Sequence, residues 1–444
     1  MRIHLSDHFT YGKLLRFTLP SIAMMIFTSV YSVVDGLFVS NFAGKTPFAA
    51  VNLIFPVLMI LGTVGFMFGT GGTAIVAKTL GAGNHEQANR YFSLFVYFAF
   101  TVGVLLAALG FVLIRPIAAA MGAVGELLDC CVLYARIVLL ALPMFSLQIL
   151  FQSFFVAAEK PKLGFWVTLS SGCTNMILDS VLCTLLPQEW KLVGAAVATA
   201  VSQTVGGLIP LFYFFRPNDS LLRLGSTRFD GKAVWRACTN GSSEFMSNIS
   251  MSVVSILFNL QLIKYAGENG ISAYGVMMYV SMIFTAVFVG YSIGSSPVIS
   301  YHFGTQNTGE LKSLLHKSLV ICGSVGVGMV AAAELMSVPL ARLFVGYDAE
   351  LKDLTVSGFR VFALSFAFIG FGIFMSGFFT ALNDGLTSAI ISFVRTLILE
   401  SAAVLILPML FGINGIWFST VFAEGAAVVL GVVFLFAKRK RYRY

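Results

Sequence analysis

The segment Gly71–Asn84, with the sequence GGTAIVAKTLGAGN, has a counterpart in the second half of the chain. The counterpart is Gly294–Asn307, with the sequence GSSPVISYHFGTQN, which lies 223 residues further on. Both segments begin with glycine and end with asparagine, and Gly81 of the first matches Gly304 of the second. One such match is weak, so its value depends on whether the same register continues elsewhere.

The register does continue along the chain. Phe154 matches Phe378 at a separation of 224 residues, and Gly194 matches Gly415 at a separation of 221. Matches that keep their order and nearly their spacing indicate an internal duplication. The predicted division is an N-terminal half over residues 1–215, a polar linker over residues 216–236 and a C-terminal half over residues 237–444.

The composition indicates a membrane protein. Of the 444 residues, 58% are hydrophobic and 11% are charged, and the mean hydropathy is +0.89, whereas soluble proteins have about 25% charged residues. The surface must therefore face lipid. Although the net charge is +8, the basic residues flank apolar runs and form no aromatic-interleaved patch, so we expect no nucleic-acid partner.

Twelve apolar runs are long enough to cross a bilayer as helices. Because the runs are continuous and do not alternate, they favour an all-α protein over a β-barrel. The predicted transmembrane helices cover approximately residues 14–40, 48–76, 92–113, 131–156, 163–186, 192–215, 240–266, 272–299, 314–335, 356–382, 386–410 and 413–437.

The basic residues predict the orientation of these helices. Most Lys and Arg residues lie in one set of connections, together with the basic segment 438–443. The positive-inside rule then places both termini in the cytoplasm of a multi-pass protein of the cell membrane. Six helices per half make the two halves parallel repeats about an axis along the membrane normal. This architecture is typical of alternating-access transporters.

The sequence shows no catalytic constellation. No two histidines have metal-ligand spacing, and the six cysteines have neither a Cys-x-x-Cys pair nor a histidine partner. The segment Gly290–Gly294 has the spelling of a nucleophile elbow, but it lies inside an apolar run with no preceding strand. We therefore predict no enzyme, no catalytic residues and no cofactor.

Acidic residues inside the predicted spans are candidates for function, because charge is costly in a bilayer. Asp35 follows Pro20 in the first helix, and Pro20 is the predicted hinge. Asn175 and Asp179 are one turn apart on the fifth helix, and Ala195 and Thr199 are one turn apart on the sixth. If Asp35 meets Asp179, the pair can hold a proton, or a Na⁺ ion together with oxygens of Asn175 and Thr199. Alternatively, Ser and Thr hydroxyl groups satisfy each carboxylate and the residues only order helix contacts.

A second set of residues is predicted to line a substrate cavity between the halves. Aromatic faces attract flat cations, and buried charges can select the charge of a substrate. The candidates are Tyr31, Phe55, Phe154, Tyr274, Phe378, Arg395 and Glu400. Two further acids, Glu244 and Glu424, receive no assigned role; Glu424 occupies the repeat position of Gln203.

Several of these motifs resemble those of the multidrug and toxic compound extrusion (MATE) transporters. They are YSVVDGLFV at 31–39, LGAGN at 80–84, NMILD at 175–179, GAAVAT at 194–199 and GFFTA at 377–381. The resemblance implies twelve helices in two six-helix lobes and export of amphipathic, often cationic compounds. In the DNA-damage-inducible (DinF-like) branch, which this chain resembles, it implies coupling to H⁺ or Na⁺ at Asp35, Asn175, Asp179 and Thr199 with the carbonyl of Ala195.

Another branch of the family uses acids in helices seven and ten. Here the predicted tenth helix has no acidic residue, and Glu244 of the seventh lies near the cytoplasmic end. The leading hypothesis is thus a cation-coupled multidrug antiporter coupled through its N-terminal half, and we expect a monomer. The alternative is a flippase for lipid-linked precursors, which would need a basic cavity where these spans offer little beyond Arg395.

Overall fold

The computed structural model describes residues 3–43, 45–345 and 348–444, and within these ranges it contains helices and no strands. The N-terminal half contains α1 (Tyr11–Phe38), η1 (Val39–Ala43), α2 (Lys45–Met67), η2 (Phe68–Gly72), α3 (Thr73–Gly81), α4 (His85–Ala120), α5 (Gly125–Leu140), α6 (Leu142–Ala157), α7 (Pro161–Leu185), η3 (Gln188–Trp190) and α8 (Lys191–Phe215). The C-terminal half contains α9 (Gly231–Asn240), α10 (Ser242–Gly304), α11 (Thr308–Val345), α12 (Ala349–Ala363), α13 (Phe366–Ala381), α14 (Gly385–Phe393), η4 (Val394–Leu399), α15 (Glu400–Phe411) and α16 (Ile413–Tyr442).

These elements confirm the predicted all-helical membrane fold. Nine helices of the described chain are long and apolar enough to span a membrane, and two bent pairs raise the number to 11. The bent pairs are α5 with α6, at 58°, and α12 with α13, at 45°. The remaining long helix is α7, which carries the polar residues of the predicted coupling site. Two predicted spans form the single element α10, which breaks at Gly267, where φ is +59°.

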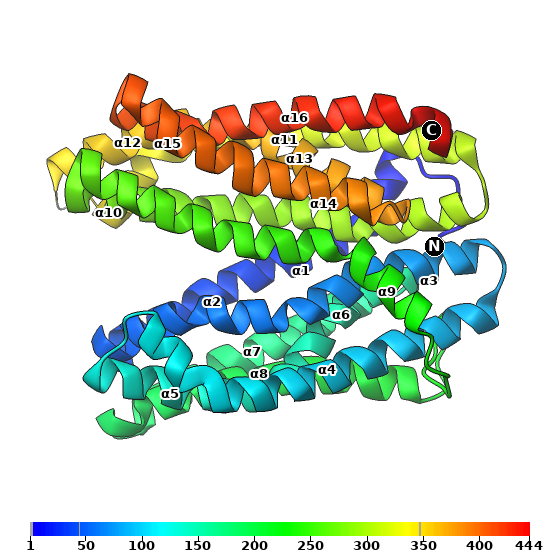
Figure 1. The fold of residues 1–444 in the computed structure, drawn as a ribbon, viewed down its shortest axis with the longest axis horizontal. Coiled ribbons are helices and arrows are strands. Elements are labelled where there is room, and N and C mark those ends of the chain that lie inside the picture. The colour runs from blue at the N-terminus through cyan, green and yellow to red at the C-terminus, as the bar shows by residue number, and fades with distance from the viewer. Residues whose placement is uncertain (1–2, 44, 346–347) are drawn as a thin grey trace.

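The two halves lie side by side (Figure 1). Helices α2 to α8 form one group and α10 to α16 form the other, and both termini lie at the same end of the molecule. The groups are close at this end and diverge towards the opposite end. We call the end that carries the termini the closed end.

Helix α1 belongs to both halves. Its first turns share a buried cluster with the C-terminal half, in which Leu14 and Phe17 pack with Phe374 and Phe378. Further along, α1 packs against α7, where Gly172 lies against Phe27 and Tyr31. The start of α1 therefore packs on the C-terminal half, where its apolar side chains contribute to the buried core.

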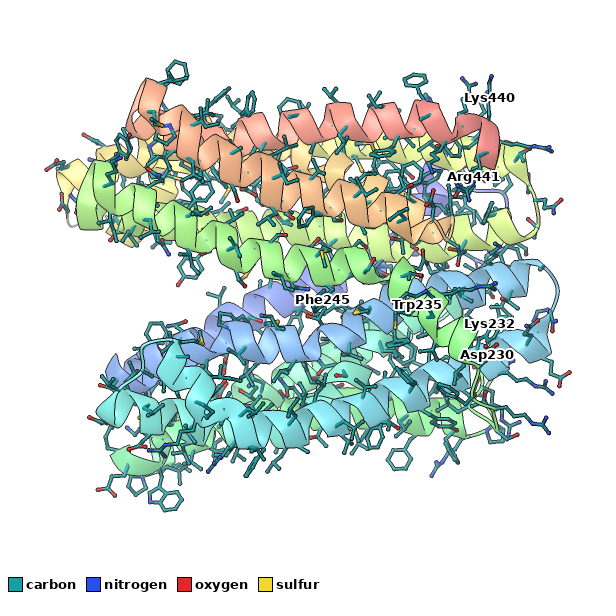
Figure 2. The ribbon with its side chains drawn as sticks, in the orientation of Figure 1. Asp230, Lys232, Trp235, Phe245, Lys440 and Arg441 are labelled. Carbon is teal, nitrogen blue, oxygen red and sulfur yellow. The ribbon has the colours of Figure 1, made fainter. Side chains whose placement is uncertain are left out.

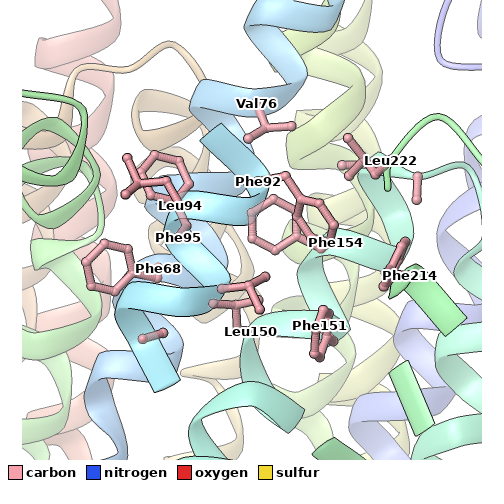
Figure 3. Close-up of a cluster of buried hydrophobic side chains, with 14 of the residues drawn as sticks. Phe68, Val76, Phe92, Leu94, Phe95, Leu150, Phe151, Phe154, Phe214 and Leu222 are labelled. Atoms are coloured by element: carbon pink, nitrogen blue, oxygen red, sulfur yellow. The ribbon is translucent and has the colours of Figure 1, made fainter. Parts of the chain in front are cut away.

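Each half has its own aromatic core. Figure 3 shows Phe92, Phe151, Phe154 and Phe214 packed together in the N-terminal half. The ring centroids of Phe92 and Phe154 are 4.9 Å apart, and those of Phe92 and Phe214 are 5.0 Å apart. Because lipid chains are as apolar as Phe, close van der Waals packing rather than the hydrophobic effect holds such helices together in a bilayer. Geometrically favourable aromatic pairs add about 0.5–1.5 kcal/mol each.

The halves meet through the repeated segments identified in the sequence. Gly81 of α3 packs against the backbone of Tyr301 and Gly304, and Gly304 packs against the backbone of Lys78. Close by, Nδ2 of Asn240 donates to the carbonyl oxygen of Gly71 at 3.3 Å and to that of Thr380 at 2.9 Å. At the closed end, Gly81 and Gly304 therefore let the two backbones approach closely, and the Asn240 side chain adds hydrogen bonds.

The segment before α1 fastens the two halves together at the closed end. Glu159 accepts from the backbone N–H of Leu5 at 2.7 Å and lies 2.7 Å from Nδ1 of His4. Glu310 accepts from the backbone N–H of Phe9 at 2.9 Å and lies 2.6 Å from Nδ1 of His8. Glu159 follows α6 and Glu310 lies in α11, so one short segment binds both halves.

Candidate functional site

The predicted coupling residues come together between α1, α7 and α8. Asp179 is fully buried, Asn175 is 2% exposed and Asp35 is partly buried. Asp35 lies in the last turn of α1, immediately before the π-helical turn η1. There, the N–H of Val39 donates to the carbonyl oxygens of both Asp35 and Gly36. Such π turns are frequent at functional sites.

The carboxyl groups of Asp35 and Asp179 lie close enough to interact directly, and Asp35 also interacts with the side chain of Asn175. Oδ1 of Asp35, both carboxylate oxygens of Asp179 and Oδ1 of Asn175 are buried without a hydrogen-bond partner of normal geometry. A buried polar oxygen without a partner is unfavourable, and two adjacent buried carboxylates cannot both stay charged without a cation. The arrangement therefore fits a shared proton or a small cation.

Further oxygen ligands surround this pair. Oγ1 of Thr199 donates to the carbonyl oxygen of Ala195 at 3.1 Å, which places both predicted α8 groups together. The hydroxyl group of Tyr134, a residue of α5 that is 4% exposed, interacts with the Thr199 side chain. Carboxylate, amide and hydroxyl oxygens are the donors that hard cations prefer. Within the described residues, no group of three His, Cys, Asp or Glu side chains could hold a metal, so a cation here would depend on the neutral oxygens as well.

A chain of polar side chains leads away from Asp35. The hydroxyl group of Tyr31 interacts with the side chain of Gln148. Nε2 of Gln148 donates to Oγ of Ser171 at 3.2 Å, and Oγ of Ser171 donates to the carbonyl oxygen of Ser202 at 2.7 Å. Sequence reasoning missed Gln148 and Tyr134. Their signal, a polar group inside an apolar run, is shared with many residues that only order helix contacts.

A second buried polar cluster lies in the C-terminal half. Arg395, in the π-helical turn η4, donates from Nε and Nη2 to the carboxylate of Glu424 at 2.8–3.0 Å. Glu400 lies beside this ion pair and accepts from Oγ1 of Thr420 at 3.3 Å. Tyr274 lies close to Glu400. Because Glu424 neutralises Arg395, the cluster has one carboxylate in excess.

The structure does not bring all the predicted cavity residues together. Phe154 and Phe378 are fully buried in the cores of opposite halves, where packing with Phe92 and Tyr444 occupies their rings. Phe55 is 52% exposed on α2. Tyr31, Tyr274, Arg395 and Glu400 do belong to the two polar clusters.

Pro20, the predicted hinge, lies inside the continuous helix α1. Nearby, Oγ1 of Thr18 donates to the carbonyl oxygen of Leu14 at 3.0 Å. Since proline has no N–H, it leaves one backbone carbonyl of α1 without its helical partner. Pro20 lies within the part of α1 that packs on the C-terminal half, because Thr18 before it lies against Gly294 and Ile22 after it lies against Gly290.

Comparisons with known proteins agree with this arrangement. The MatE family model matches the chain twice, over residues 20–181 and 245–406, which is one match for each half. The multidrug export protein MepA of Staphylococcus haemolyticus is 25% identical over 432 residues, covering 97% of this chain and 94% of MepA. MepA of Staphylococcus aureus strain MRSA252 is 23% identical with the same coverage.

A solved structure supports the fold. It is an outward-facing conformation of a multidrug resistance MATE family transporter of the MOP superfamily, with a TM-score of 0.92 and 22% identity, covering 98% of this chain and 97% of that one. The curated relatives are export proteins and not enzymes. The two matches of the family model cover most of the chain, one in each half, and the chain belongs to the MatE family.

Proposed function

We propose that this protein exports amphipathic organic cations by alternating access, driven by H⁺ or Na⁺ that binds between Asp35 and Asp179. The observation that carries the proposal is the pair of adjacent carboxyl groups, three of whose oxygens are buried without a hydrogen-bond partner. Entry of one such ion supplies about 2.3 kcal/mol per 100 mV of membrane potential. The export function named for the MepA relatives supports the direction of transport.

Helix α1 connects the ion site to the rest of the molecule. Its end carries Asp35, and its beginning packs against α10, where Thr18 lies against Gly294 and Ile22 lies against Gly290. An ion between Asp35 and Asp179 strengthens the contact of α1 with α7, so its release favours another position of α1. Pro20 lies among the contacts with α10 and before those with α7, and its missing hydrogen bond makes bending of α1 easier. Ion occupancy thereby biases the contact between the halves.

The excess carboxylate in the C-terminal half supports a cationic substrate. Glu400 has a 3.3 Å hydrogen bond from Thr420, whereas Arg395 is bound to Glu424. Tyr274 beside it stacks on Phe258, with centroids 4.9 Å apart at an interplanar angle of 7°. A carboxylate next to stacked aromatic rings is a suitable environment for a flat organic cation.

The excess of Lys and Arg at the closed end supports cytoplasmic termini and a plasma-membrane protein. With the closed end in the cytoplasm, the conformation is closed to the inside. The coupling residues follow the pattern of the DinF-like branch, and each half buries its own core, which supports a monomer.

The alternative, flipping of a lipid-linked precursor, has less support. A phosphate group would need a free basic side chain within the spans. Arg395 is held by Glu424 through three hydrogen-bond contacts. A charge already paired at 2.8 Å is a poor ligand for phosphate.

The test is export of a fluorescent organic cation from proteoliposomes under separately imposed Na⁺ and H⁺ gradients. The proposal predicts export under one gradient and loss of that dependence in Asp35→Asn. Asp129→Asn is the matched control, because Asp129 is exposed and pairs with Arg115 at 3.3 Å. Export that depends on neither gradient would overturn the assignment. Export by Asp35→Asn that still depends on the same ion gradient would overturn it as well.

A further inference from the structure

A hollow of about 510 Å³ lies at the closed end, between the start of α11 and the end of α16. Four basic side chains line it, those of Lys312, Arg439, Lys440 and Arg443, together with Thr308 and Tyr444. Figure 2 shows Lys440 at the end of α16. No acidic side chain lines this hollow, which we call the basic pocket.

In the part of the chain that the structure describes, these four basic side chains lack acidic partners. Within the described ranges, none of them forms an ion pair with an acidic side chain. The acids near this end have other partners: Glu310 binds His8 and the N–H of Phe9, and Asp384 lies 3.4 Å from Lys438. Four unpaired cations around one hollow repel one another and gain from a shared anion.

The basic pocket is fixed in place by the fold. Arg443 adopts a left-handed backbone conformation, with φ of 56°, and its N–H donates to the carbonyl oxygen of Arg439. This turn brings Tyr444 back into the core, where its hydroxyl group donates to the carbonyl oxygen of Leu435 at 3.0 Å and its ring lies 5.2 Å from that of Phe378. The basic side chains therefore project from an anchored turn.

We propose that the basic pocket binds the phosphate-containing headgroup of an anionic phospholipid. The apolar run of α16 ends at Ala437, directly before the basic residues, so the pocket lies at the level of the lipid headgroups. The N-terminal N–H groups of α11 add to the attraction for an anion. Clusters of Lys and Arg just outside a membrane helix recognise anionic lipids. Each basic residue adds a similar increment to the binding affinity. Free inorganic phosphate carries the same type of charged group, but unlike a phospholipid it is not held in the membrane next to the pocket.

The test is lipid binding to the purified full-length protein, followed by native mass spectrometry. The probes are phosphatidylglycerol and phosphatidylcholine in mixed micelles. The expected result is tighter binding of phosphatidylglycerol, weakened about 10- to 30-fold by Arg439→Gln with Arg443→Gln. The matched control is Arg228→Gln with Lys232→Gln, two exposed basic residues of the linker region, for which at most a twofold change is expected.

Two further binding measurements test the proposal independently of the double variant. Lys312→Gln removes one charge from α11 without touching the C-terminal turn, so it reports on the pocket even if the double variant folds poorly. Inorganic phosphate at 10 mM is added as a competitor. Equal binding of both lipids, equal losses in the test and control variants, or full displacement by phosphate would each overturn the proposal. The readout is binding, so it does not depend on transport.

Discussion

Gly81 and Gly304 pack against each other across the boundary between the two halves, and they are also equivalent positions of the internal repeat. A methyl group on Gly81 would collide with the backbone of Tyr301, and one on Gly304 would collide with the backbone of Lys78. Because 223 residues also separate Lys78 and Tyr301, the contact is symmetric about the axis that relates the halves. The repeat therefore serves to close one end of the molecule.

Gly81→Ala is expected to weaken this closure, because backbone atoms have little freedom to move away from the new methyl group. Overpacking of this kind costs about 1–3 kcal/mol, enough to shift the population towards the form that is open at this end. Spin labels at the exposed positions Lys162 and His316 should report a longer distance between the halves. Gly328→Ala is the control, since a methyl group there meets nothing within 4 Å. An unchanged distance distribution in Gly81→Ala would contradict the role given to the repeat.

Glu310→Ala is expected to release the N-terminal segment from the C-terminal half. The side chain of Glu310 is 7% exposed and binds both His8 and the N–H of Phe9. A hydrogen bond to a charged group contributes about 1.5–3 kcal/mol, so hydrogen exchange at the Phe9 amide should accelerate tenfold or more. Glu86→Ala, which removes an exposed carboxylate paired with Arg90, should leave exchange there unchanged. Full protection of Phe9 in Glu310→Ala would show that other contacts hold the segment.

Arg395→Met is expected to destabilise the C-terminal half by about 3–5 kcal/mol, because it leaves a buried carboxylate without its partner. The side chains of Arg395 and Glu424 are 13% and 6% exposed. The double variant Arg395→Met with Glu424→Met should recover most of the loss, as measured by thermal unfolding in detergent. Arg360→Met, which breaks a 3.6 Å pair of half-exposed residues, should cost less than about 1 kcal/mol. If the double variant were no more stable than the single one, the unpaired carboxylate of Glu424 would not be the cause of the destabilisation.

Asp384 provides a pH test at the turn before α14. Burial by itself raises the pKa of Asp384, but hydrogen bonds from Tyr442 and Thr387 and the charge of Lys438 outweigh it, so its pKa lies below the ordinary 3.8. A lowered pKa in the folded state stabilises the fold above about pH 4, and this contribution is lost as the pH falls through the folded value. Asp384→Asn should therefore lower the unfolding temperature by the same amount at every pH from 5 to 8. A difference that changes within this range would mean that another group controls the turn.

The fold was predictable where the signal is local. Continuous apolar runs predict spanning helices, because a helix satisfies its own backbone hydrogen bonds inside a bilayer. The break at Gly267 and the bends between α5 and α6 and between α12 and α13 were not predicted. They depend on packing against other helices, which a hydropathy pattern does not contain.

The candidate site was predictable in part for a similar reason. Asn175 and Asp179 share a helix face by spacing alone, and the cost of a carboxylate inside a bilayer makes Asp35 a candidate. Tyr134 and Gln148 come from other helices, and nothing in their own segments distinguishes them. The pairing of Arg395 with Glu424, 29 residues apart, and the binding of Glu310 to the N-terminal segment likewise exist only in the folded chain.

The most direct test of ion coupling at Asp35 and Asp179 is the reverse flux. Coupling is reciprocal, so a gradient of an organic cation alone, imposed across proteoliposomes without an ion gradient, must drive H⁺ or Na⁺ in the opposite direction. We expect such a flux of one ion in the unmodified protein and in Asp129→Asn, and its loss in Asp179→Asn. An organic cation that crosses downhill without any ion flux, or an ion flux that persists in Asp179→Asn, would contradict it.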